Sequence, residues 1–326
     1  SGTESTGPIT VATIFTITCT GAGGSASASA TVGVSGSSAS IFPLHVEAGK
    51  RYLVDANGAP FLIHGDTPWS LIVQLPTADV DLYLEDRRQK GFNAILVNLI
   101  EHYFATNPPN NVYGEPPFLT PGNFSTPNEA YFAHAEYVIA KAAEKGILVL
   151  LTPAYMGFGG GSQGWYAEMQ SNGTAALRAY GQYLATRFLQ HDNILWVHGG
   201  DFNPPERNLM RAIVDGIRDV DTRWLHTFHG SRGTAALQFL GPAETWLQVN
   251  NIYTTMNTVV ASAFQEYNRS TMPFFLIEAY YEHENSVTLA GLRTQAYVTM
   301  FSGGCGHMFG NAPIWHFDSL GASNGG

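Results

Sequence analysis

The sequence predicts an α/β protein: a (β/α)8 TIM barrel preceded by a small amino-terminal β-hairpin. The chain has 326 residues, a length that suits one such barrel with a small appendage. Apolar strand-like runs recur eight times, separated by helical patterns, and no Gly-rich nucleotide-binding motif follows any of them. The missing motif disfavours the alternative fold, an open doubly wound sheet.

The amino-terminal segment, residues 1–40, consists almost entirely of Ser, Thr, Gly, Ala and Val. Two alternating stretches, 14–20 and 28–34, flank a turn at 21–24, and this pattern predicts a hairpin rather than a flexible linker. The Ser-rich stretch 35–40 is typical of a linker. We therefore expect a boundary near residue 40, with the hairpin and linker in 1–40 and the barrel in 41–326.

The barrel elements follow from hydrophobic periodicity. A first hairpin is predicted where residues 51–55 and 60–63 flank Asn57-Gly58, a strong hairpin turn. The predicted barrel strands are 61–65, 94–98, 147–153, 194–198, 225–229, 247–252, 274–278 and 306–309. The predicted helices are 78–90, 128–144, 175–190, 207–219, 259–267 and 286–301. Near-continuous apolar strands followed by helices indicate parallel strands buried on both faces. After the eighth strand we expect no full helix.

Composition and charge exclude several classes of partner. Charged residues make up 13% of the chain, the net charge is -10, and no Lys/Arg cluster could follow a phosphate backbone, so nucleic acid is not an expected partner. No apolar run reaches the roughly 20 residues of a membrane span. The two cysteines, Cys19 and Cys305, lie far apart and predict neither a disulfide framework nor a zinc site. The sequence does not determine the oligomeric state.

Two carboxylates stand where a barrel enzyme carries its chemistry, at the carboxyl ends of strands. Asp201 follows the fourth strand and Gly199-Gly200, and Glu278 closes the seventh. A retaining glycosidase needs two carboxyl groups about 5 to 5.5 Å apart, one protonating the leaving oxygen and one attacking the anomeric carbon. We expect this pair to be catalytic, with no metal and no cofactor.

Each carboxylate also has a structural interpretation. Asp201 could cap the helix that begins near Arg207, and Glu278 could belong to a buried ion pair. Glu282 and Glu284 are rivals, but they lie beyond the strand end, where a solvated charge is more common. A serine hydrolase is disfavoured because the chain has no GxSxG motif.

Aromatic and polar residues just past other strand ends predict a sugar-binding rim. The candidates are Asp66, Trp69, His102, Tyr103, Tyr155, His229, Tyr253 and Trp315. The alternative is that the aromatics belong to the core and that His198 and His229 are core histidines; no closely spaced set of ligands supports a metal site. Arg232, after the fifth strand, is the candidate cation for an acidic substrate.

Four motifs carry a family resemblance. Residues 64–69 (HGDTPW), 91–93 (GFN), 196–204 (WVHGGDFNP), and Glu278 with Tyr281-Glu282 resemble the apiosidase-like family of (β/α)8 glycoside hydrolases over residues 50–318. The resemblance implies Asp201 as acid/base and Glu278 as nucleophile. It also implies release of apiose-linked units from pectin. One departure is Gly200-Asp201, where most relatives in the wider clan carry Asn-Glu.

A second resemblance concerns the hairpin. Residues 18–29 are similar to the closing hairpin of bacterial immunoglobulin-like repeats, which occur in secreted carbohydrate-active enzymes. The resemblance implies that 1–40 is the remnant of an immunoglobulin-like domain and that the protein is secreted.

Together these observations predict a retaining glycoside hydrolase acting on a plant cell-wall or microbial polysaccharide. Two alternatives stay open. One is another exo- or endo-glycosidase of the same barrel, on an arabinose-containing or glucan chain. The other is a catalytically silent carbohydrate-binding barrel.

Overall fold

The computed structural model describes residues 13–32 and 40–317 and divides the chain into two units, Ser1–Ser40 and Ile41–Gly326. The first contains the predicted hairpin: β1 (Thr13–Gly21) and β2 (Gly24–Val32) pair antiparallel. Hydroxyl groups pair across the strands at Thr16–Ser29, Thr18–Ser27 and Thr20–Ser25. The hairpin is confirmed, and its immunoglobulin-like origin stays a prediction.

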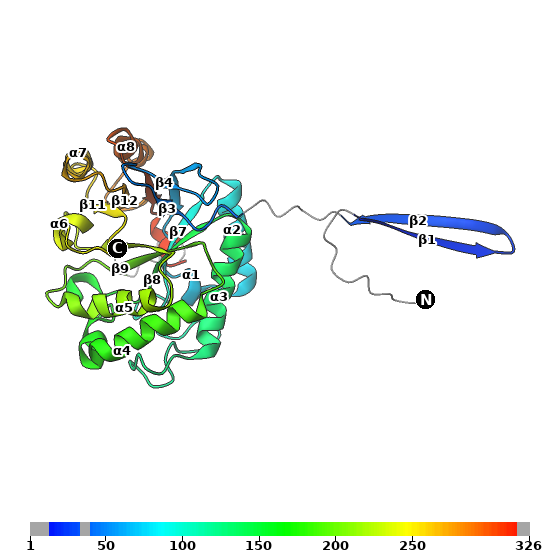
Figure 1. Cartoon of the computed structure of the whole chain (residues 1–326), viewed down its shortest axis with the longest axis horizontal. Helices are drawn as coiled ribbons and strands as arrows, with labels where there is room; N and C mark the ends of the chain where they lie inside the picture. Colours follow the sequence, from blue (N-terminus) through cyan, green and yellow to red (C-terminus); the bar gives the residue numbers. More distant parts are fainter. Residues whose placement is uncertain (1–12, 33–39, 318–326) are drawn as a thin grey trace. The chain divides into compact units, whose positions relative to one another are not determined.

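The second unit is the predicted (β/α)8 barrel (Figure 1). Its eight parallel strands run in the order β10-β9-β8-β7-β6-β13-β12-β11. Their bounds are β6 (Ile63–Asp66), β7 (Ala94–Asn98), β8 (Leu148–Thr152), β9 (Ile194–Gly199), β10 (Leu225–His229), β11 (Asn250–Tyr253), β12 (Phe274–Glu278) and β13 (Gly306–Phe309). The fold class is confirmed, and the boundaries at β7, β10, β12 and β13 match the prediction to the residue.

Polar side chains join β10 to β11, the two strands at the ends of this order. The hydroxyl of Thr227 donates to the carbonyl of Val249 at 2.6 Å, and the Asn251 amide donates to Thr227 at 2.8 Å and to the Phe228 carbonyl at 2.7 Å. Both Thr227 and Asn251 are fully buried. Their hydrogen bonds therefore satisfy groups that burial would otherwise leave unpaired.

Strand side chains alternate between two layers of core. Along β8, Leu148 and Leu150 pack inside the barrel, whereas Val149 and Leu151 pack against the helices. A short sheet of β3 (His45–Val46), β4 (Leu53–Val54) and β5 (Pro60–Phe61) adds Leu53 and Phe61 to the interior cluster. Leu53 and Phe61 pack with residues at the amino ends of the barrel strands. The opposite end of the barrel, where the strands have their carboxyl ends, is therefore left for a site.

Helices surround the strands (Figure 1). They are α1 (Leu71–Gln74), α2 (Thr77–Gln89), α3 (Glu129–Glu144), the single-turn η1 (Phe158–Gly160), α4 (Tyr166–Arg187), α5 (Arg207–Val220), α6 (Ala236–Leu240), α7 (Val259–Arg269), α8 (Leu289–Phe301) and α9 (Ala312–Trp315). All six predicted helices are present. No helix of the described residues is long and apolar enough to cross a membrane.

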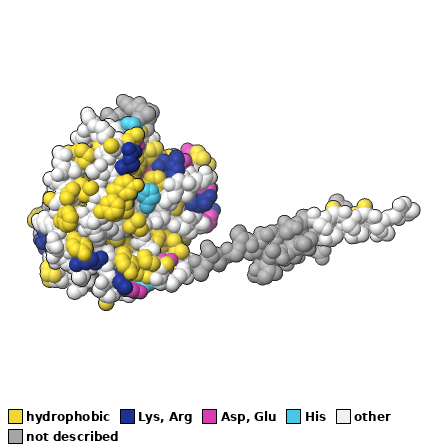
Figure 2. All heavy atoms as spheres, turned by 90° about the horizontal axis from the view of Figure 1, so that it is seen from above, with side chains coloured by type: hydrophobic (Ala, Val, Ile, Leu, Met, Phe, Trp, Pro, Cys, Tyr) yellow, Lys and Arg dark blue, Asp and Glu magenta, His cyan; other side chains and the backbone are white. Residues whose placement is uncertain are grey.

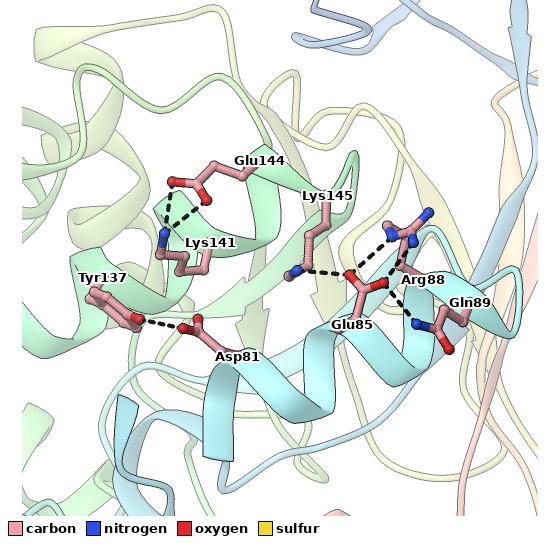
Figure 3. Close-up of polar contacts among 8 residues, drawn as sticks. All are labelled: Asp81, Glu85, Arg88, Gln89, Tyr137, Lys141, Glu144 and Lys145. Carbon is pink, nitrogen blue, oxygen red and sulfur yellow. Dashed lines mark hydrogen bonds and ion pairs between the residues drawn. The ribbon is translucent and has the colours of Figure 1, made fainter. Parts of the chain in front are cut away.

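Polar contacts hold α2 against α3 (Figure 3). Glu85 of α2 accepts hydrogen bonds within its own helix from Arg88 at 2.6 Å and Gln89 at 2.9 Å. It also accepts one from Lys145, at the end of α3, at 2.9 Å. The contact with Arg88 contributes most to lowering the pKa of Glu85. The Tyr137 hydroxyl of α3 donates to Asp81 of α2 at 2.9 Å. This helix pair thus relies on charge and hydrogen bonds at its outer edge.

The outer face of β6 and β13 is only partly covered. Among the described residues, β13 is followed by the four-residue helix α9, and a groove of about 500 Å³ lies between these strands and α8. Leu62, Tyr297 and Met300 help to line it. Figure 2 shows one face of the molecule on which hydrophobic side chains gather, with charged side chains both among them and at the edge.

Candidate active site

A cavity of about 400 Å³ opens where the carboxyl ends of the barrel strands meet; we call it the carboxylate cavity. Its lining residues are Trp69, Asn98, Phe104, Tyr155, Asp201, Arg232, Glu278, Tyr281, His283, Glu284, Asn285 and Trp315. Five of the predicted site residues are among them: Trp69, Tyr155, Asp201, Glu278 and Trp315.

Asp201 is held by a turn with unusual backbone geometry. It has a φ of 47°, and Gly199 and Gly200 before it have φ values of 91° and 125°. A side chain at Gly200 would come within 2.2 Å of the Tyr155 ring, so glycine is required there. A positive φ at a non-glycine residue stores strain and is frequent at functional sites. The turn therefore favours a functional role for Asp201.

The Asp201 carboxylate has one satisfied oxygen and one open oxygen. The Tyr155 hydroxyl donates to Oδ2 at 2.7 Å. Within the described structure, Oδ1 is buried and has no hydrogen-bond partner. Asp201 does not cap α5, whose N-cap residue is Glu206, so the capping alternative is wrong. One carboxylate oxygen thus is left without a hydrogen bond and can carry a proton.

Glu278 ends β12 and is largely buried, with 12% of its side chain exposed. Its Oε2 atom lies 2.9 Å from Nε2 of His229. Burial and the nearby charge of Asp201 raise the pKa of Glu278, and the hydrogen bond from His229 opposes this rise. Two carboxyl groups this close do not readily ionise together.

His229 connects the Glu278 carboxylate to the backbone of Asp201. Its Nδ1 accepts a hydrogen bond from the backbone N–H of Asp201 at 3.0 Å, so the neutral ring carries its proton on Nε2 and donates it to Glu278. Ligand atoms of Asp201, His229 and Glu278 all lie within 4.8 Å of one another. A single buried ring therefore holds the Glu278 side chain beside the turn that carries Asp201.

These three residues are also the one group among the described residues spaced closely enough to hold a metal ion. The imidazole fits that use poorly. Its Nδ1 lone pair is taken by the Asp201 amide, and its Nε2–H is directed at Glu278. A cation would have to displace one of these hydrogen bonds to gain His229 as a ligand.

Aromatic side chains form the cavity wall. The Trp69 indole N–H donates to the Tyr281 hydroxyl at 2.8 Å, and the Trp69 and Tyr155 ring centroids are 6.3 Å apart. Phe104 lies edge-on to Trp315 at 5.0 Å and to Tyr155 at 6.0 Å. Such packing fixes the rings in place. They offer rigid apolar surface beside the two carboxylates.

Arg232 is the one Lys or Arg among the described residues that line this cavity. It donates to the Tyr253 hydroxyl at 3.0 Å, and its guanidinium lies 5.0 Å from the centre of the Tyr253 ring. The Tyr253 ring is in turn 5.0 Å from that of His229. His229 and Tyr253, both predicted to bind sugar, thus lie behind the cavity wall and position the residues that form it.

Three other predicted residues lie elsewhere. His102 lines a separate cavity, where its Nε2 is 3.0 Å from Glu168. Tyr103 is 51% exposed and lies edge-on to Phe104. Asp66 is fully buried; it accepts hydrogen bonds from the Tyr83 hydroxyl and its own neighbour's backbone amide and forms an ion pair with Arg87 at 3.1 Å. Asp66 therefore joins β6 to α2 and does not face the cavity, which corrects the sugar-binding expectation for this residue.

Several lining residues were not predicted. Phe104 follows Tyr103 in a loop without periodicity. His283 and Asn285 belong to the loop after β12 and have positive φ values of 70° and 50°. The position of this loop directly after Glu278 could have predicted that it lines the cavity, since the loops after the strands form the site of a barrel enzyme.

Comparisons with known proteins agree with the barrel fold. A glycoside hydrolase family 5 protein from Bacteroides vulgatus is 25% identical, with a TM-score of 0.72 over 86% of this chain and 65% of that protein. A structure described as a glycoside hydrolase gives the same identity and TM-score over 87% of this chain and 68% of its own. The endo-1,4-β-mannanase from Rhizomucor miehei is 10% identical, with a TM-score of 0.61 over 82% of this chain and 90% of its own, which shows a shared fold.

A comparison with curated proteins gave no match. The family model described as the apiosidase-like catalytic domain matches residues 47–324, nearly the whole barrel unit. The chain belongs to the apiosidase-like family, and it spans about two thirds of the length of the first glycoside hydrolases it matches.

Proposed function

We propose that this enzyme is a retaining hydrolase of a plant cell-wall or microbial polysaccharide, with apiose-containing pectin as the favoured substrate. The observation that carries the proposal is the spacing of Asp201 and Glu278, whose nearest ligand atoms lie within 4.8 Å. A retaining pair is about 5 to 5.5 Å apart, whereas an inverting pair needs about 6.5 to 9.5 Å to admit a water molecule. The spacing supports direct attack by a carboxylate.

The contacts of the two carboxyl groups differ and suit them to different roles. Glu278 accepts the His229 N–H and has the Arg232 guanidinium nearby, and both favour its ionised form. Asp201 accepts a neutral hydroxyl from Tyr155 and keeps Oδ1 free. We therefore assign the nucleophile to Glu278 and the acid/base to Asp201.

In the first step, a Glu278 oxygen attacks the anomeric carbon while the bond from that carbon to the leaving oxygen breaks. Asp201 gives its proton to the leaving oxygen. In the second step, Asp201 takes a proton from water, whose oxygen attacks the anomeric carbon and releases Glu278 as a carboxylate. The two carboxyl groups return to their starting states, and these two reaction steps need no metal or organic cofactor.

The favoured substrate follows from the family and from Arg232. Pectin carries carboxylates, and Arg232 places a cation in a cavity that otherwise holds Asp201, Glu278 and Glu284. A guanidinium binds a carboxylate through two parallel hydrogen bonds. Because such polymers are found outside cells, we also propose that the enzyme is secreted.

The test is sugar release from purified polysaccharides: apiose-containing pectin, arabinan, β-glucan and β-mannan. Glu278→Gln is the control, because it keeps the side-chain shape and removes the nucleophile. We expect products from the pectin with wild-type enzyme and none with Glu278→Gln. Release from arabinan or β-glucan alone would favour the other glycosidases. Binding without release would favour a silent carbohydrate-binding barrel.

A further inference from the structure

A second cavity, of about 410 Å³, lies on the loops that follow β7 and β8; we call it the proline cavity. Pro109, Pro116, Pro117 and Pro121 contribute to its walls together with Phe118 and Leu119. Most of this wall is apolar and much of it comes from rigid rings. A surface of this kind can hold a ligand without losing much side-chain freedom on binding.

The proline cavity and the carboxylate cavity are lined by neighbouring residues of the same loops. His102 lines the proline cavity and Phe104 lines the carboxylate cavity; Tyr103, which is half-exposed, lies between them in the chain. The backbone N–H of Trp165, which lines the proline cavity, donates to the carbonyl of Tyr155, which lines the carboxylate cavity, at 2.8 Å. Two adjacent pieces of chain thus form walls of both cavities.

The polar groups of the proline cavity fit a neutral ligand with hydroxyl groups. His102 and Glu168 form a pair at 3.0 Å, and each side chain is 29% exposed. An imidazole and a carboxylate can exchange hydrogen bonds with hydroxyls. No Lys or Arg is among the described residues that line this cavity, so an anionic ligand has no counter-charge here.

We propose that the proline cavity is a subsite for a neutral sugar unit of the same polysaccharide, remote from the bond that is cleaved. Sugar rings present apolar C–H faces and hydroxyl edges, which match the proline and aromatic walls and the His102–Glu168 pair. The polymer passes over Tyr103 to reach it. This inference rests on the proposed function, because it concerns the substrate of that site.

Leu119→Trp tests the subsite by narrowing the cavity. Leu119 is 71% exposed, and Leu82 on α2, away from both cavities, is also 71% exposed, so Leu82→Trp is the matched control. We expect the KM for the polysaccharide to rise by on the order of fivefold in Leu119→Trp, and by less than twofold for a nitrophenyl glycoside. Leu82→Trp should change neither value. Equal changes for the two substrates in Leu119→Trp would overturn the subsite.

Tyr103→Ala is the second variant, with Tyr297→Ala on α8 as its control because the two side chains are 51% and 52% exposed. Tyr103→Ala keeps the subsite testable if the Leu119→Trp variant does not fold. Wild-type enzyme that cleaves nitrophenyl glycosides but no polysaccharide would overturn the subsite and leave the hydrolase standing. Wild-type enzyme that cleaves neither would overturn the proposed function itself.

Discussion

Nε2 of His229 lies 2.9 Å from Oε2 of Glu278, and the opposite nitrogen of the same ring accepts the backbone N–H of Asp201. The ring is fully buried. It therefore links Glu278 to the backbone of Asp201 and opposes the rise in the pKa of Glu278. A substitution here should change the chemistry without touching the sugar directly.

His229→Ala should lower kcat by about 100-fold and leave KM within a few-fold, because it removes a positioning group. It should also move the acid limb of the pH profile of kcat/KM to higher pH, since the lost hydrogen bond no longer lowers the pKa of Glu278. Steady-state kinetics across pH measure both effects. An unshifted acid limb in a folded variant would show that His229 does not control Glu278.

The two carboxylates should respond differently to the leaving group. Glu278→Ala should abolish turnover on every substrate. Asp201→Ala should lose about 10²–10⁴-fold on natural linkages but retain activity on aryl glycosides whose leaving group needs no proton. Rates on a series of aryl glycosides separate the roles. Equal residual rates for both variants on an activated glycoside would contradict the assignment.

Arg232 should matter for acidic substrates alone. Arg232→Ala should raise the KM of an acidic oligosaccharide by about tenfold, and Arg232→Lys by less, because Lys keeps the charge but not the paired geometry. A neutral aryl glycoside is the control and should show a far smaller change. Unchanged kinetics on the acidic oligosaccharide would remove the pectic part of the proposal.

Glu101 should make stability depend on pH. Burial raises its pKa to about 7, and its Oε1 accepts from Ser70 at 2.9 Å. Between its usual value and about 7, the folded state keeps a proton that the unfolded chain releases, so stability falls as pH rises through this window. Glu101→Gln should reduce this loss of unfolding free energy by on the order of 1–3 kcal/mol. Melting temperatures from pH 5 to 8 test this, and equal slopes for both proteins would refute it.

Sequence reasoning predicted the strands best. The runs at 94–98 and 274–278 are apolar on both faces and end in a polar residue, so the sequence marks where these strands end. β11 begins at Asn250, later than predicted. Its first two residues, Asn250 and Asn251, are buried and form hydrogen bonds that hydropathy does not reveal. The helix predicted from residue 175 is the second part of α4, which begins at Tyr166. Gly173 has a non-helical φ of 71° and divides α4 into two helical segments, and the predicted start falls just after this break.

Asp201 and Glu278 could be predicted as site residues because catalytic groups of a barrel lie at strand ends. Residues could not be assigned to the site where the direction of the side chain decides whether it faces the cavity. Asp66 also ends a strand, but it alternates with Ile63 and Gly65, which face the barrel interior, and so points to α2. The separation of His102 and Phe104 into two cavities depends on loop conformation, and no periodicity encodes it.

The most direct test of the account is the anomeric configuration of the first sugar released, followed by proton NMR before mutarotation. A Glu278 nucleophile held within 4.8 Å of Asp201 predicts that the product keeps the configuration of the cleaved bond, since two displacements restore it. A product of inverted configuration would contradict the account, because it would require a water molecule between the carboxylates.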